Sequence, residues 1–207
     1  MTSWRITGRC FIDPPPSDWQ VRLATRLGQR PRRLGRWVEL ALLGALHCMD
    51  DAGEPTLPSR ALLSVATLHG PDLALRAALV EARDGPPLPI AFLNSQPGQV
   101  LPALAQHLLW QGDGRCVASR DPVTTLILAC TSTAPGGLLL GWVDEDWPGR
   151  SLWLRLVMDG AAGVRLRRLD FCELADPGIT HIALDGKRLK GGARPPAGPD
   201  NECRVDA

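Results

Sequence analysis

The sequence predicts a layered α/β protein with a mixed, mainly parallel sheet covered by helices. Short apolar runs alternate with segments whose apolar residues recur at helical spacing, the pattern of βαβ units. With 207 residues, 44% hydrophobic and 22% charged, the composition is that of a folded globular chain. A net charge of +1 argues against a nucleic-acid partner. No apolar run reaches the length of a membrane span and no secretory signal is visible, so we expect a cytoplasmic protein without a membrane span.

Two elements are expected in the first quarter of the chain. Residues 4–12 alternate loosely, are rich in Ile, Phe and Trp, and stop at the prolines 14–16, which predicts a strand. Residues 34–49 place apolar side chains at i, i+3, i+4 and i+7 and are followed by the polar turn 50–53. That spacing predicts an amphipathic helix.

The middle of the chain continues the alternation. The apolar run 62–67 predicts a buried strand, and Asp72 opens a helix that we expect to reach Ala82. Prolines then break the chain, and we expect residues 90–98 to form a loop that enters a helix over 99–110.

The next elements are a short strand, a helix that begins at Asp121 and Pro122, and three further strands. Residues 116–119 predict a brief strand, and Asp121 followed by Pro122 predicts the cap and first turn of a helix that reaches Thr133. We expect further strands over 138–143, 151–158 and 164–171. The expected organisation is a domain over 1–158, an extension over 159–190 and a Gly/Pro-rich disordered tail over 191–207.

Several segments, in this order, resemble the N-terminal half of a β-ketoacyl synthase, which has the thiolase-type fold. The likeness covers residues 4–158. It is carried by Arg33-Leu34-Gly35-Arg36 opening an apolar helix that ends at Gly53, the strand 63–70 with its Thr/Gly turn, Phe92–Gly98, Gly112–Val117 and Leu138–Glu145.

The resemblance implies a cysteine nucleophile at the start of a helix, nine positions after the last glycine of the preceding turn. Counting from Gly114 gives Val123, which cannot form a thioester, so Val123 is the expected vestigial nucleophile position. Cys130 has similar neighbours, but too few residues follow it for a helix before the next strand, so we expect a packing residue. Cys116 is expected to be a small neutral residue. These two thiols are the remaining catalytic candidates.

Other catalytic or ligand-binding groups are not expected. The family's two catalytic histidines come from the C-terminal half of its fold, which we expect this chain to be too short to contain. The cysteines lie far apart without a Cys-x-x-Cys pair, so we expect reduced thiols and no metal or cofactor. The acidic run Asp144-Glu145-Asp146 is expected to be a solvated turn at a strand end rather than a cation site.

The resemblance therefore implies a non-catalytic, chain-length-factor-like subunit. Such a subunit would form a heterodimer with an active β-ketoacyl synthase in fatty acid or polyketide-type biosynthesis, as in aryl polyene or xanthomonadin-like pigment pathways. The expected contacts with the partner or the acyl tunnel are Phe92, Asn94, Gln96, Asp121, Val123 and Leu126.

The residues are also compatible with three other roles. Arg26, Arg30, Arg33 and Arg36 could dock an acidic acyl carrier protein or form an ordinary solvated face. The chain could instead be a small acyltransferase or thioesterase that uses Cys130 or Cys116. It could also be a self-associating binding protein.

Overall fold

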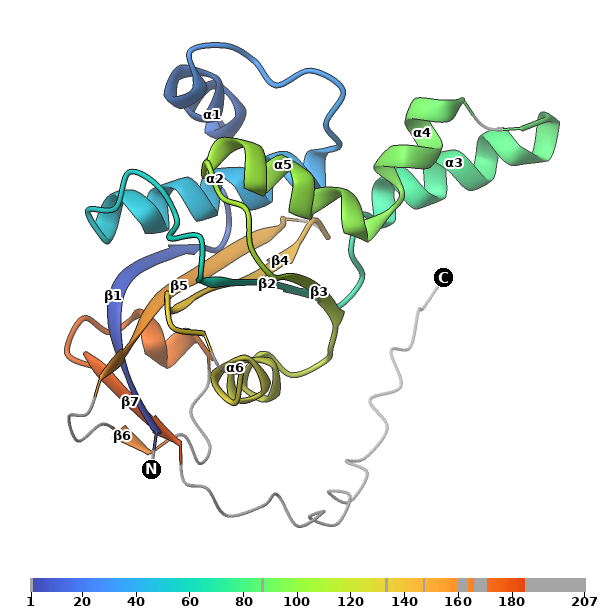
Figure 1. Ribbon diagram of the computed structural model, residues 1–207. Helices are drawn as coiled ribbons and strands as arrows, with labels where there is room; N and C mark the ends of the chain where they lie inside the picture. The colour runs from blue at the N-terminus through green and yellow to red at the C-terminus, as the bar shows by residue number, and fades with distance from the viewer. Residues whose placement is uncertain are drawn as a thin grey trace, which may run out of the picture.

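A seven-stranded sheet in the order β3-β2-β4-β5-β1-β7-β6 forms the centre of the molecule (Figure 1). The computed structural model describes residues 2–86, 88–132, 134–146, 148–159, 164–165 and 171–184. The strands are β1 (Thr2–Ile12), β2 (Leu62–Thr67), β3 (Gly114–Ala118), β4 (Leu138–Asp144), β5 (Arg150–Asp159), β6 (Val164–Arg165) and β7 (His181–Leu184). The helices are α1 (Trp19–Leu27), α2 (Arg36–Asp51), α3 (Asp72–Asp84), α4 (Pro89–Asn94), α5 (Val100–His107) and α6 (Pro122–Cys130), with the short 3₁₀ segments η1 (Pro97–Gln99) and η2 (Phe171–Ala175).

The sheet is mixed, as the sequence predicts, but its antiparallel share is larger than expected. β2 pairs in parallel with β3 and β4, and β6 with β7. β5 runs antiparallel to β4 and β1, and β7 runs antiparallel to β1. The link from Asp144 to Arg150 is too short for a parallel crossover, which needs a dozen or more residues, so β5 must return beside β4 in the opposite direction.

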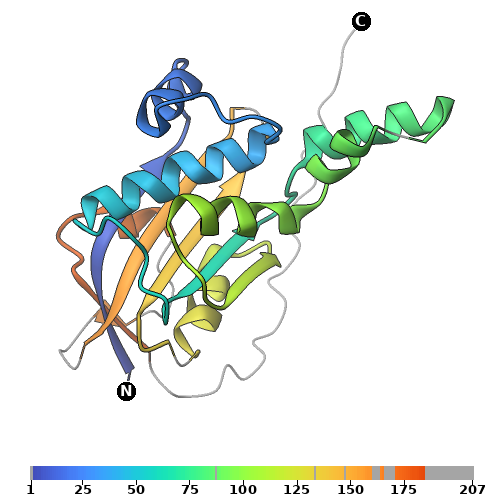
Figure 2. The same cartoon turned by 45° about the horizontal axis from the view of Figure 1, so that its top comes forward.

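Helices cover both faces of this sheet (Figures 1 and 2). α2 and α5 lie on one face, with α1 outside them, and their apolar side chains form one core cluster with Leu63, Leu139 and Trp153. On the other face, α6 and η2 bury Leu126 and Leu174 against strand residues such as Leu140 and Leu154. The layered α/β fold is confirmed.

Helix α2 is the centre of the first cluster because it is buried almost all round. Its inward side chains meet the sheet, while Trp19 and Leu23 of α1 cover its outer side. Gly44 lets the α2 backbone approach β5 closely: a Cβ atom there would lie 2.5 Å from the indole nitrogen of Trp153 and would clash with the Ser151 hydroxyl.

Several boundaries differ from the sequence predictions. α1 was not predicted, and α4 replaces the first part of the loop expected over 90–98. α6 ends at Cys130, before the expected Thr133. Of the strand expected over 164–171, Val164–Arg165 is confirmed as β6 and Phe171 begins η2. Residues 166–170 and the tail 191–207 lie outside the described residues.

The close contact at Gly44 gives a stability prediction. We expect Gly44→Ala to lower the free energy of unfolding by about 1–3 kcal/mol, because overpacking against Ser151 and Trp153 outweighs the better helix propensity of alanine. Gly98→Ala is the matched control, since a Cβ at Gly98 meets nothing within 4 Å. Urea unfolding of the two variants measures the difference, and equal midpoints would contradict the packing account.

Candidate functional site

The start of α6 has the geometry that the sequence predicts. The Asp121 carboxylate accepts hydrogen bonds from the backbone N–H groups of Val123 (3.0 Å) and Thr124 (3.2 Å), and Pro122 occupies the first turn. Val123, half-buried, therefore lies at a helix start, where the resemblance expects the nucleophile. Its side chain is a hydrocarbon and can only pack.

Neither candidate thiol lies in surroundings that favour a thiolate. Cys130 is buried at the end of α6, and burial raises its pKa to about 12. Cys116 is half-buried in β3, and burial raises its pKa as well. Within the described ranges, neither thiol forms a hydrogen bond with a histidine. A nucleophilic cysteine needs a depressed pKa or an adjacent base, so this geometry favours packing.

Two residues of the acidic run at the end of β4, Asp144 and Glu145, are buried rather than solvated, which corrects the sequence expectation for them. Asp144 is buried, and its Oδ1 accepts hydrogen bonds from the Thr67 hydroxyl and the Leu68 N–H, both at 2.8 Å. Its Oδ2 accepts the indole N–H of Trp142 at 2.8 Å. A buried carboxylate is tolerated because these donors replace water. Asp144 therefore ties the ends of β2 and β4 together.

The next two acidic residues have separate partners. Glu145 is also buried and accepts the Leu73 N–H at 2.7 Å, in the first turn of α3. Burial raises the pKa of Glu145. The hydrogen bonds from the first turn of α3 and the nearby charge of Arg36 lower this pKa, but they only partly offset the effect of burial. Asp146 contacts the Nδ1 atom of His69 at the surface. In the described part of the chain, these carboxylates form no metal-binding cluster.

An open groove of about 530 Å³ lies at the carboxyl ends of β2 and β3, lined by Leu68, His69, Ala118, Ser119 and Arg120. This is the edge at which open α/β sheets usually bind ligands. The Ser119 hydroxyl, however, donates to the Asp121 carbonyl (3.1 Å) and accepts the Asp121 N–H (3.2 Å). Ser119 thus shapes the turn into α6 and is not hydrogen-bonded to His69.

The expected partner contacts fall into two groups. Phe92 is exposed on α4 and Asp121 is exposed at the cap of α6, while Asn94, the last residue of α4, and Gln96, just after it, are half-buried. Leu126, in contrast, is fully buried in the core beneath α6, where it offers no surface to a partner.

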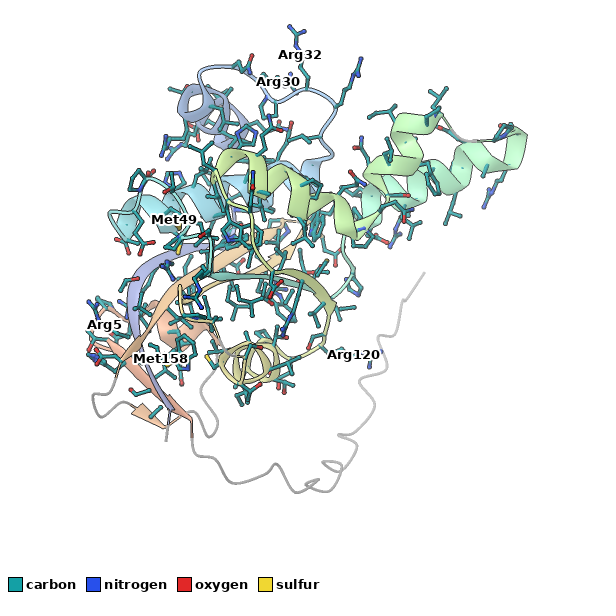
Figure 3. The ribbon with its side chains drawn as sticks, in the orientation of Figure 1. Arg5, Arg30, Arg32, Met49, Arg120 and Met158 are labelled. Atoms are coloured by element: carbon teal, nitrogen blue, oxygen red, sulfur yellow. The ribbon has the colours of Figure 1, made fainter. Side chains whose placement is uncertain are left out.

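The four arginines expected to dock a carrier protein differ in their partners and in their exposure. Arg26 is paired with Asp50 at 2.6 Å, and the Arg36 guanidinium lies 5.9 Å from the centre of the Trp19 ring. Arg30 and Arg33 are exposed on the loop between α1 and α2 and form no ion pair with the described residues. On the same loop, Arg32 extends away from the body (Figure 3).

No family model and no curated protein matches the sequence. Solved structures do match. One chain of the complex between the ketosynthase ApeO and its chain length factor ApeC, from Xenorhabdus doucetiae, has a TM-score of 0.57 and 16% identity, over 81% of this chain and 87% of that chain. This chain therefore shares the fold of that matched chain.

Two further solved structures agree at similarly low identity. The ishigamide ketosynthase/chain length factor gives a TM-score of 0.57 and 14% identity over 76% of this chain and 58% of that chain. The AntDE:AntF complex is a type II PKS acyl-carrier protein in complex with its ketosynthase bound to the hexaketide. It gives a TM-score of 0.53 and 11% identity over 76% of this chain and 63% of that chain. This chain therefore spans about six-tenths of the length of those two chains.

No helix in the described residues is long and apolar enough to cross a membrane.

The helix start at Val123 allows a test of reactivity. We expect the thiol of Val123→Cys to react with iodoacetamide at pH 8 at least tenfold faster than Cys130, because it is less buried and lies at the positive end of a helix. Peptide mass spectrometry measures both rates in one sample. Leu128→Cys, exposed in the same helix, is the control for accessibility alone. A Val123→Cys thiol as slow as Cys130 would contradict the geometry.

Glu145 gives a prediction for pH dependence. Because its pKa in the folded chain lies above 4.5, the folded chain binds more protons than the unfolded chain just above pH 4.5, and this group's contribution to stability falls as pH rises through that window. Glu145→Gln keeps an oxygen acceptor for the Leu73 N–H but cannot titrate. We therefore expect the stability of the variant relative to the natural chain to increase between pH 4.5 and 7 in urea titrations. A constant difference would contradict the assignment.

Proposed function

We propose that this chain is a non-catalytic, chain-length-factor-like subunit that pairs with an active β-ketoacyl synthase. The observation that carries the proposal is the valine at the start of α6, beside an open sheet edge, in a ketosynthase-type fold. The subunit would supply interface and tunnel wall while the partner supplies the nucleophile. The pathway we propose is of the fatty acid or polyketide type, of the aryl polyene or xanthomonadin kind.

The open edge of β3 is the first surface that supports this pairing. β2 is the sole neighbour of β3 in the described sheet. The Asp113 carbonyl accepts the Leu63 N–H, and the Ser119 N–H donates to the Thr67 carbonyl. Because peptide groups alternate in direction along a strand, the N–H groups of Gly114, Cys116 and Ala118 point to the open edge. They can pair with a strand of another chain.

The alternative of a cysteine-dependent acyltransferase or thioesterase has less support. Burial raises the pKa of both Cys130 and Cys116, and the described residues place no hydrogen-bonded histidine beside either thiol. Both thiols would be mostly protonated near neutral pH. We therefore assign the reacting cysteine to the partner synthase.

The carrier protein would approach the loop between α1 and α2. Arg30 and Arg33 are the docking residues we favour, because they are exposed and form no ion pair with described residues, whereas Arg26 is already paired with Asp50. An acidic carrier protein is the complementary partner for this loop. Arg36, the first residue of α2, would add positive charge next to this loop, with its guanidinium held over the Trp19 ring.

The direct test is co-expression with a tagged β-ketoacyl synthase encoded in the same genomic neighbourhood, followed by native mass spectrometry. We expect a one-to-one complex whose condensing activity survives Cys116→Ser and Cys130→Ala in this chain. A chain that stays a monomer in the presence of the synthase and becomes acylated on either cysteine would overturn the proposal. A homodimer that excludes the synthase would support the self-associating alternative instead.

Proline substitutions in β3 test whether its open edge binds the synthase. We expect Ala118→Pro to weaken the complex at least tenfold, because the lost N–H points outward and the side chain is exposed, so that the fold of the chain itself is little affected. Val117→Pro is the contrast: its N–H faces β2, and we expect this variant to unfold at a lower temperature. Equal binding by Ala118→Pro and the natural chain, measured by calorimetry, would remove β3 from the interface.

A further inference from the structure

A pocket of about 280 Å³ lies at the amino ends of β2 and β3, where the segments that lead into β2, β3 and β4 meet. The groove described above lies at the other ends of β2 and β3, so the two hollows are separate. The pocket is slightly smaller than the roughly 300–1,000 Å³ of most ligand pockets, which suits a small ligand. Its polar lining residues are Ser59, Arg60, Asp113, Arg115 and Ser132.

Close backbone contacts fix the walls of this pocket. The Gly136 N–H donates to the Arg60 carbonyl at 3.1 Å, and a Cβ atom on Gly136 would clash with the Ala61 backbone. A Cβ atom on Gly112 would lie 2.6 Å from the Ser59 carbonyl oxygen. The three segments are therefore packed against one another before a ligand binds, which lowers the entropy cost of binding.

The charged side chains of the pocket are not neutralised by ion pairs. Arg60, Arg115 and Asp113 are exposed, and none of them forms an ion pair with the described residues. The Arg115 Nη1 atom donates to the Ser132 hydroxyl at 2.9 Å, which orients this guanidinium and leaves its other N–H groups available. Two positive charges and one negative charge thus line the pocket, and the balance attracts an anion.

We propose that this pocket binds a small anion that carries a phosphate group, held mainly by Arg60 and Arg115. A guanidinium presents a planar fork of N–H donors that matches pairs of phosphate or carboxylate oxygens. A phosphate group carries about −1.5 to −2 charges at pH 7 and three strong acceptor oxygens, so it can use two guanidinium groups where a single carboxylate cannot. This site is independent of the pairing with a synthase.

Calorimetric titration of the full chain with pyrophosphate tests the site. We expect saturable binding that Arg60→Gln and Arg115→Gln each weaken at least tenfold, since each variant removes one charge and its hydrogen bonds. Arg120→Gln is the matched control. Arg120 is also exposed and without an ion pair to the described residues, but it lies beyond the other end of β3, so we expect binding within twofold. Thermal unfolding of Arg60→Gln should match that of the natural chain.

Asp113→Asn gives a readout of the opposite sign. This variant removes the negative charge of the pocket, so we expect pyrophosphate to bind at least twofold more tightly. A loss of folded structure cannot produce tighter binding. Weaker binding by Asp113→Asn, with thermal unfolding unchanged, would show that the ligand must carry a positive group, and the assignment to a simple anion would be wrong.

Three further ligands identify the chemistry and its source. We expect glycerol 3-phosphate, a soluble phosphate ester, to compete with pyrophosphate, and succinate, a dicarboxylate, to bind at least tenfold more weakly. The proposal fails if millimolar pyrophosphate and glycerol 3-phosphate show no saturable binding, or if succinate binds equally well. It also fails if the chain binds phosphatidic acid vesicles but neither soluble ligand, or if Arg120→Gln weakens binding as much as Arg60→Gln does. None of these results affects the proposed pairing with a synthase.

Discussion

One buried carboxylate holds together the part of the molecule on which the functional interpretation depends. Asp144 accepts hydrogen bonds from Thr67, Leu68 and Trp142, and so joins the carboxyl ends of two parallel strands. Glu145 then receives the first turn of α3, and Asp146 contacts His69. Three consecutive residues thereby fix the start of α3 and the wall of the groove beside β3.

A second buried charge stabilises the opposite end of the sheet. Arg155 is 2% exposed, pairs with Glu54 at 3.0 Å, and donates to the carbonyls of Gly136 (3.0 Å) and Leu156 (2.9 Å). A buried guanidinium is tolerated when its donors are satisfied in this way. Gly137, with φ at +84°, must remain glycine here, because a Cβ atom would clash with this guanidinium. Each end of the central strands is thus held by one buried charge that forms several hydrogen bonds.

The sequence predicts what local patterns determine. The strand 62–67 and the Asp121-Pro122 helix start are confirmed because apolar runs and caps act over a few residues. The roles of Asp144 and Glu145 were missed because three of their donors, Thr67, Leu68 and Leu73, lie more than seventy positions away along the chain. α1 was missed because Trp19 and Leu23 are its only buried side chains, in a helix rich in polar residues. The vestigial role of Val123 stays a prediction.

An inert helix start at Val123 and the open edge of β3 support the proposed pairing with a β-ketoacyl synthase. Hydrogen–deuterium exchange of the chain, alone and mixed with a β-ketoacyl synthase, tests this combination most directly. We expect slower exchange over residues 92–96 and 114–126, with exchange in α1 unchanged. Unchanged exchange over both segments, or protection confined to α1 and α2, would contradict the proposed pairing.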